Sequence, residues 1–307
     1  MTTPIRLINF PGAPNLPIFV ALEKGFFEAA GVAPVLNTTP SSAEQIRNLV
    51  GGKYDIAGTA IDNVVAYREG QGAVAFDPTP DIFAFMGATQ LELSLIVAPE
   101  IKSFADLTGK SIALDALATG FAFILYRMMD NARLARVDVT LAAVGATPQR
   151  WDSVRRGEHA GTLTIEPFTA MAKAEGFNVL KTSRETVAAY QGGSFATLRD
   201  WAADNQSALM GFINGYLDGL DWVLRPDNRS AASQILLRNM PRINPKAIDA
   251  VMDKLLSPET GLTPNAAIDA AGFDTVLELR SQYGGLNLTT PARYLDLSYY
   301  ETVLAQR

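Results

Sequence analysis

Short β-type runs alternate with helical patterns along the first two thirds of the chain, and this alternation limits the folds it can adopt. Residues 5–9 predict a strand, residues 16–30 an amphipathic helix, and residues 32–37 a second strand. Parallel strands need crossover connections of this kind, so the pattern favours a mostly parallel sheet with helices on both faces. Further strands are expected at 54–58, 82–87, 93–98, 110–114, 139–144, 161–165 and 177–181, and further helices at 61–70, 119–131 and 167–175.

The alternation occurs in two similar rounds and is followed by a different pattern. Residues 51–57 lead into the third strand of the first round, and a similar polar run, residues 156–160, precedes the matching strand of the second. From residue 198 to residue 283 the pattern is nearly all helical. The sequence therefore predicts an α/β protein of two comparable lobes, each a mostly parallel sheet flanked by helices, with a helical C-terminal tail.

Composition excludes several classes of function. The chain has 26 basic and 32 acidic side chains, and its net charge of −6 disfavours non-specific binding to nucleic acid or anionic membranes. The absence of cysteine excludes disulfides, thiolate metal sites and a cysteine nucleophile, and one histidine cannot form a multi-histidine site within a chain. That residue, His159, lies in a polar run typical of a surface turn. We therefore expect no catalytic residue, no metal and no cofactor.

The N-terminus carries no signal-peptide pattern. Met1 to Pro4 lead directly into the first strand, without a basic region or a long apolar stretch. No run approaches the roughly 18 consecutive apolar residues of a transmembrane helix. Two interpretations stay open. The sequence is a mature periplasmic form whose signal peptide has been removed, or the protein is cytoplasmic and Met1 is its native start.

The candidate ligand site follows from the loops after the predicted strands. In open α/β sheets ligands bind beyond the carboxyl ends of the strands, where helix N-termini present free N–H groups. These loops carry hydroxyls, aromatic rings and acids but no Lys, Arg or His, a lining that suits a small aromatic or heteroaromatic solute. The candidate ligand-binding residues are Phe10, Asn15, Ser41, Ser42, Thr59, Asp62, Asp115, Thr119, Gly120, Phe121, Glu166, Phe168 and Tyr190.

Several of these candidates have a structural role as an alternative. Ser41 and Thr119 are each placed to cap the helix that follows them. Asp115 directly follows a strand and can serve as a ligand acceptor or as a helix cap. Glu166 can contact the ligand or complement a helix dipole. Phe168 can form a stacking platform or belong to the core.

Four segments in order resemble one protein family. They are residues 16–27 (LPIFVALEKGFF), 49–57 (LVGGKYDIA), 104–110 (FADLTGK) and 165–168 (IEPF), and the similarity covers most of residues 5–180. By these segments the chain resembles the solute-binding proteins of ABC transporters of the nitrate, sulfonate, taurine and thiamine-pyrimidine type. The resemblance implies a type II periplasmic-binding-protein fold, with two α/β lobes, two crossing hinge segments and a ligand cleft between the lobes.

The resemblance also implies a domain division and a function. The first lobe would comprise residues 1–90 and 191–307 and the second residues 91–190, with Gln90 and Gln191 near the hinges. Such a protein would be a monomer and not an enzyme. It would bind a small organic solute by hinge closure and deliver it to the membrane permease of an ABC importer.

The acidic side chains expected near the cleft bear on the charge of the solute and on the alternative functions. Asp115 and Glu166 near the cleft would repel an anion, which favours a neutral or amine-bearing solute. Two other functions on the same fold stay open, a small-molecule-processing enzyme and a cytoplasmic ligand sensor. The enzyme would need Asp115 or Glu166 as its catalytic base.

Overall fold

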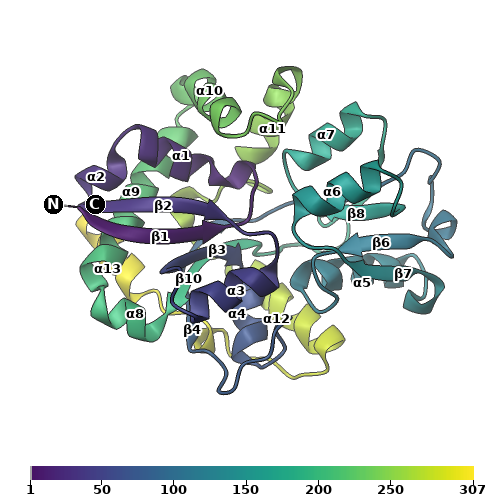
Figure 1. The fold of residues 1–307 in the computed structure, drawn as a ribbon, viewed down its shortest axis with the longest axis horizontal. Coiled ribbons are helices and arrows are strands. Elements are labelled where there is room, and N and C mark those ends of the chain that lie inside the picture. The colour runs from purple at the N-terminus through teal and green to yellow at the C-terminus, as the bar shows by residue number, and fades with distance from the viewer. Residues whose placement is uncertain (1) are drawn as a thin grey trace.

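The computed structural model describes residues 2–307 and contains two five-stranded sheets, which lie beside each other along the long axis of the molecule (Figure 1). The strand order is β2–β1–β3–β10–β4 in the first sheet and β7–β6–β8–β5–β9 in the second. We call each sheet, with the helices packed on it, a lobe. The first lobe holds β1 (Thr3–Asn9), β2 (Val32–Thr38), β3 (Ile56–Ala60), β4 (Ile82–Thr89) and β10 (Gly193–Leu198). The second lobe holds β5 (Ser94–Val97), β6 (Ser111–Leu114), β7 (Thr140–Ala143), β8 (Gly161–Thr164) and β9 (Asn178–Thr182).

One strand of each sheet runs against the other four. β10 is antiparallel to β3 and β4, and β5 is antiparallel to β8 and β9. These two strands begin where the chain has just passed from one sheet to the other, over residues 90–93 and 183–192. In the second passage, the Gln191 side chain donates to the Gly193 carbonyl at 2.7 Å. The prediction of two lobes with mostly parallel sheets is confirmed.

Helices cover both sheets. Those in the first round are α1 (Leu16–Glu23), α2 (Phe26–Ala29), α3 (Ser42–Val50) and α4 (Ile61–Arg68), and those in the second are α5 (Gly120–Asn131), α6 (Thr147–Arg155) and α7 (Phe168–Ala174). After β10 come α8 (Arg199–Asp204), α9 (Gln206–Leu224), α10 (Arg229–Asn239), α11 (Ile248–Leu255), α12 (Ala270–Gly284) and α13 (Ser298–Gln306). Ser41 caps α3 as predicted, since its Oγ accepts from the Glu44 N–H at 3.1 Å.

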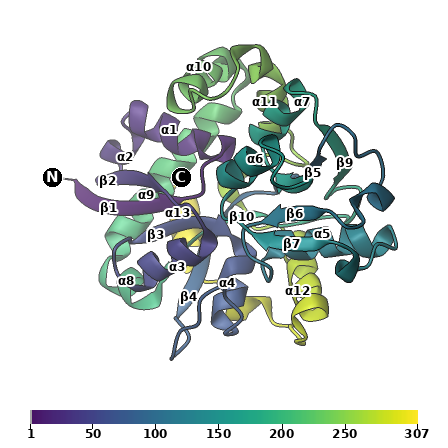
Figure 2. The same ribbon diagram turned by 45° about the vertical axis from the view of Figure 1, so that its right-hand side comes forward.

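The C-terminal helices build the core of the first lobe and also reach the second. α9 packs closely on α1 and α2, and the Phe27 and Phe212 rings stack at 5.5 Å. A side chain at Gly219 would collide with the Pro17 carbonyl, so glycine permits this approach. α12 packs against both α4 and α5 (Figure 2). The tail therefore connects the two lobes on the side of α4 and α5.

Two predicted features differ from the structure. The single helix expected over residues 16–30 is divided into α1 and α2, because Gly25 adopts a left-handed conformation with φ of +73°. The sequence pattern also does not predict β10, which lies between the second passage and the helical tail.

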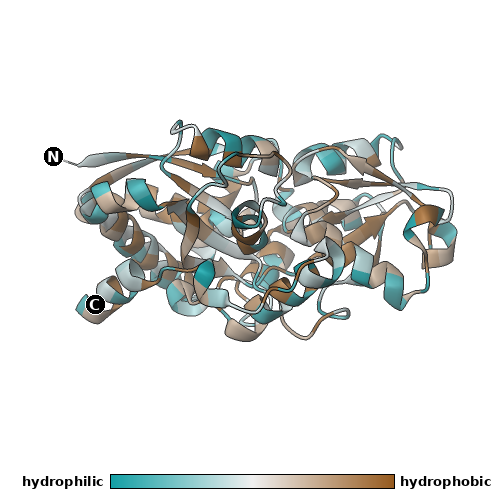
Figure 3. Ribbon diagram, turned by 90° about the horizontal axis from the view of Figure 1, so that it is seen from below, coloured by the Kyte–Doolittle hydropathy of each residue, from teal (hydrophilic) through white to brown (hydrophobic). Residues whose placement is uncertain are grey.

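Apolar residues gather on the strands inside each lobe, and hydrophilic residues lie mainly on the outer helices (Figure 3). Across residues 2–307, no helix has the length and apolar character needed to cross a membrane.

Candidate functional site

A cavity of about 870 Å³, including the space open to solvent, lies between the two lobes. Its walls come from the carboxyl ends of β1, β3, β6 and β8 and from the N-termini of α5 and α6, the edge at which ligands bind in this class of sheet. Seven predicted candidates line it, namely Phe10, Asn15, Thr59, Asp115, Thr119, Gly120 and Phe121. The other six, Ser41, Ser42, Asp62, Glu166, Phe168 and Tyr190, lie outside its lining.

Side-chain amides hold the first-lobe wall in place. Asn9 accepts from the Gly58 N–H at 2.9 Å and donates to the Asn15 side chain at 2.9 Å. Asn15 in turn donates to the Phe10 carbonyl at 2.9 Å. Because both its amide groups are engaged, Asn15 shapes the loop that presents the Phe10 ring to the cavity.

The second-lobe wall includes a capped helix end. The Thr119 Oγ1 accepts from the Ala122 N–H at 3.3 Å and donates to the Ala116 carbonyl at 3.2 Å. The capping role predicted for Thr119 is confirmed. Next to it, the Phe121 ring adds apolar surface to the cavity.

Arg150 lines the cavity but is not among the candidates predicted from the sequence. Those candidates come from the loops after strands, whereas Arg150 lies on the first turn of α6. It is 1 % exposed, and its Nη2 donates to the Thr147 Oγ1 at 2.8 Å. Among the described residues, its Nε and Nη1 have no hydrogen-bond partner. Burial lowers the pKa of the guanidinium to about 10, and the negative charge of Asp115 opposes this shift. The cavity lining thus includes a buried cation, two of whose nitrogen atoms have no hydrogen-bond acceptor among the described residues.

One sequence signal points to Arg150. A cation in the first turn of a helix opposes the helix dipole, so arginine at this position is unfavourable unless another group requires it. Thr147 and Pro148 mark the start of the helix, which places Arg150 in that turn. The sequence therefore offers a reason to consider Arg150 as a residue that binds an anionic ligand.

Asp115 joins the two lobes across the cavity. It lies just after β6, and both of its carboxylate oxygens are within hydrogen-bond distance of the Ser42 N–H, at 3.3 and 3.1 Å. Ser42 is the first residue of α3 in the first lobe. The carboxylate therefore complements a helix N-terminus of the opposite lobe. The helix-cap alternative for Asp115 is present in the structure, although the helix is not the one that follows it in sequence.

Asp62 makes a second contact between the lobes. Its carboxylate forms a fully buried ion pair with Arg280 of α12, with distances of 2.6 and 2.7 Å. It also accepts from the Gly120 N–H of α5 at 2.6 Å, and Arg280 donates to the Ala118 carbonyl at 2.9 Å. These partners engage both oxygens of the Asp62 carboxylate. Asp62 therefore has a structural role outside the cavity lining and is not available to a ligand.

Two aromatic candidates are buried away from the cavity. Phe168 packs against Trp151 and Ile96 in a separate core of the second lobe, which corresponds to the core alternative. Tyr190 is 5 % exposed and lies against Gly120, where a side chain would collide with its hydroxyl.

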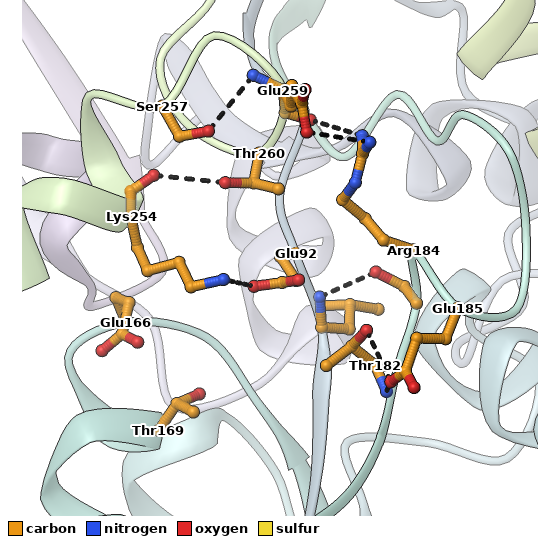
Figure 4. A network of polar contacts seen from close by, with 12 residues as sticks. Glu92, Glu166, Thr169, Thr182, Arg184, Glu185, Lys254, Ser257, Glu259 and Thr260 are labelled. Atoms are coloured by element: carbon orange, nitrogen blue, oxygen red, sulfur yellow. Dashed lines mark hydrogen bonds and ion pairs between the residues drawn. The ribbon is translucent and has the colours of Figure 1, made fainter. Parts of the chain in front are cut away.

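Glu166 lines a smaller neighbouring cavity, and Figure 4 shows it from close by with other residues of that lining. Burial raises the pKa of its carboxyl to about 7, and a hydrogen bond from the Ala170 N–H at 3.2 Å opposes the rise. His159 is in the lining of neither cavity, and its ring shares a hydrogen bond with the Ser111 hydroxyl at 2.7 Å. Within the described part of the chain, no three His, Asp or Glu side chains form a cluster that could hold a metal ion.

The two lobes with a cavity between them have the fold of periplasmic binding proteins. The nitrate-binding protein NrtA from Synechocystis PCC 6803 superposes with a TM-score of 0.83 at 15% identity, covering 99% of this chain and 89% of NrtA. The alkanesulfonate-binding protein SsuA from Xanthomonas axonopodis pv. citri, solved bound to MOPS, has a TM-score of 0.75 at 15% identity, covering 96% and 98%.

The chain belongs to the NMT1-like family, whose model matches residues 2–237. No curated protein sequence matches it. The desulfurization enzyme DszB also shares the fold, with a TM-score of 0.66 at 13% identity and coverage of 98% and 99%. The fold thus occurs in binding proteins and in an enzyme, and function must be argued from the site.

Proposed function

We propose that this protein captures a small organic anion in the cavity between its lobes and delivers it to an ABC importer in the membrane. The observation that carries the proposal is Arg150. A buried charge with unsatisfied donors is unfavourable, and a bound anion would accept the missing hydrogen bonds and add negative charge beside the guanidinium. The free donors of Arg150 therefore gain hydrogen-bond acceptors only when a ligand occupies the cavity.

The rest of the lining favours an organic body over a simple inorganic ion. The rings of Phe10, Phe121 and Phe195 and the side chains of Leu91 and Ile165 line the same cavity. Apolar and aromatic walls of this extent gain free energy by burying hydrocarbon or ring surface. The expectation from the sequence of a neutral or amine-bearing solute rested on repulsion of an anion by Asp115 and Glu166. In the structure Arg150 lines the cavity with Asp115 and opposes its charge, and Glu166 lies outside the lining.

Capture would proceed by closure of the two lobes, which we assign to residues 1–90 with 191–307 and to residues 91–190. Gln90 and Gln191 lie in the two passages at which a hinge would act. The contact of Asp115 with the Ser42 N–H crosses the cavity and would stabilise the closed arrangement. Hinge closure buries the solute and presents a single shape to the permease.

The neighbours support transport as the setting. NrtA and SsuA are described as a periplasmic nitrate-binding and an alkanesulfonate-binding protein, and both superpose over nearly the whole chain. By this analogy we place the protein outside the cytoplasmic membrane, and we propose that it acts there as a monomer without a cofactor. The enzyme alternative has less support, since Asp115, one of its two candidate bases, is engaged by the Ser42 N–H.

A thermal-shift screen tests the proposal. The panel groups alkyl and aryl sulfonates, aromatic carboxylates, pyrimidines and purines, and amines. A solute at about 100 times its Kd stabilises the native state by about 2.7 kcal/mol and raises the Tm by several degrees. We expect shifts among the sulfonates or carboxylates that disappear in an Arg150→Met variant. Shifts confined to uncharged or purely cationic compounds would refute anion capture.

A further inference from the structure

A second, smaller cavity of about 390 Å³ adjoins the main one. Four residues line both cavities, Pro14, Thr89, Leu91 and Ile165. We call the smaller cavity the annex. Because the annex shares this wall with the main cavity, a solute held at Arg150 can extend toward it.

The annex holds one carboxylate that is only partly satisfied. Among residues 2–307, the single hydrogen bond to the Glu166 carboxylate comes from the Ala170 N–H, at 3.2 Å to Oε2. Lys254, the cation that lines the annex, is already paired with Glu92 at 2.5 Å. Figure 4 shows this pair opposite Glu166, with no contact drawn between Lys254 and Glu166. The annex therefore carries an excess of negative charge when Glu166 is ionised, and Glu166 has a free acceptor oxygen.

The shared wall adds a second free acceptor. The Thr89 side chain is 1 % exposed, and its hydroxyl has no hydrogen-bond partner in the part of the chain that the structure describes. A buried hydroxyl without a partner costs free energy that a bound polar group would recover. Because Thr89 lines both cavities, a polar atom of a ligand held at their junction could become the partner of this hydroxyl.

We propose that the annex is a second recognition point for the same solute, in which Glu166 and Thr89 accept hydrogen bonds from an ammonium group while Arg150 holds the anionic end. The solute class is then an amine-bearing organic anion with an apolar spacer. This inference rests on the proposed function, since it needs an anion at Arg150. It assigns Glu166 as a specificity-determining residue.

The electrostatics of the annex give this recognition a pH dependence. Burial raises the pKa of Glu166 to about 7, with Lys254 and Lys173 lowering it and Glu92 raising it. An ammonium group opposite the carboxylate favours its ionised form. Recognition of the amine should therefore be strong above neutrality and weaken as the carboxylate is protonated.

Calorimetric titration with two isosteric pairs tests the proposal. The pairs are aminopropanesulfonate with butanesulfonate, and para-(aminomethyl)benzoate with para-ethylbenzoate, each differing in an ammonium group against a methyl group. At about pH 8 we expect the ammonium member of the better-fitting pair to bind about tenfold or more tightly. The preference should disappear in Glu166→Gln and shrink in the wild type at about pH 5.5.

Glu175→Gln is the matched control. Glu166 lies just before α7 and Glu175 just after it, but Glu175 is exposed and pairs with Arg155. It should keep the preference. Equal binding within both pairs, or a preference that survives in Glu166→Gln, overturns the annex assignment while anion capture stands. If neither these four anions nor any anion of the thermal-shift panel binds, the proposed function fails and the annex assignment fails with it. If Glu166→Gln does not fold, the wild-type pH dependence decides.

Discussion

Replacing Arg150 by methionine should change stability and solute binding in opposite directions. The guanidinium is 1 % exposed and has one hydrogen bond, to the Thr147 hydroxyl. Burial lowers its pKa from 12.5 to about 10. One pKa unit corresponds to about 1.4 kcal/mol, so the charge costs the unliganded protein about 3 kcal/mol.

Methionine occupies much of the same volume without a charge. Loss of the hydrogen bond to Thr147 offsets about 1 kcal/mol of the gain, which leaves a net stabilisation of about 1–3 kcal/mol. An unfolding entropy of about 2 cal/mol/K per residue converts this to a Tm rise of about 2–5 °C for a chain of this length. Anion binding should fall at least about a hundredfold, because two charge-assisted hydrogen bonds are lost.

Differential scanning fluorimetry without solute and calorimetric titration with it measure the two effects on the same preparation. Arg156→Met is the control, since Arg156 follows α6, is exposed and pairs with Glu158. It should leave both quantities unchanged. A lower Tm for Arg150→Met would show that the native protein already compensates the buried charge. Unchanged anion affinity would remove Arg150 from the site.

Three further changes follow from the contacts around the cavity. Asp115→Asn keeps an acceptor for the Ser42 N–H but removes a negative charge, so calorimetry should show severalfold tighter anion binding at low salt; weaker binding would mean that Asp115 contacts the solute. Because the pKa of Glu166 is raised in the folded state, wild-type stability should fall as the pH rises from about 4.5 to about 7. Glu166→Gln should lose this dependence in denaturant titrations and exceed the wild type near pH 8, and parallel curves would contradict the shift. His159→Ala should leave solute affinity unchanged, since its ring bonds Ser111 outside the cavity lining, and a large loss would show that this turn takes part in binding.

Much of the fold follows from local patterns because most strands and helices of both rounds alternate at regular spacing. β10 is the exception. It has six residues, and its partners β3 and β4 precede it by about one hundred residues or more. A strand stabilised mainly by such distant pairing has little local signal. The break at Gly25 has a different cause, since glycine within a helical pattern can either continue the helix or leave it.

The site was partly predictable for a similar reason. Loops at the carboxyl ends of strands can be located from the strands alone, and seven of the thirteen candidates line the cavity. The six others follow strands or passages just as closely. Their side chains make contacts with other residues that the sequence pattern does not reveal. Asp62, for example, pairs with Arg280, which is more than 200 residues away in the sequence.

The charge of the cleft shows why counting loop residues misleads. The sequence suggested a surplus of acids, with Asp115 and Glu166 opposing an anion. In the structure Asp115 is engaged by the Ser42 N–H, and Glu166 lies in the annex, so neither stands free in the main cavity. Arg150 comes from a helix turn instead of a loop, and among the described residues two of its guanidinium nitrogens have no hydrogen-bond partner. A ligand forms hydrogen bonds with the polar atoms that the protein leaves unsatisfied. Here these atoms, rather than formal charges in a loop, favour an anion at one end of the solute and a hydrogen-bond donor at the other.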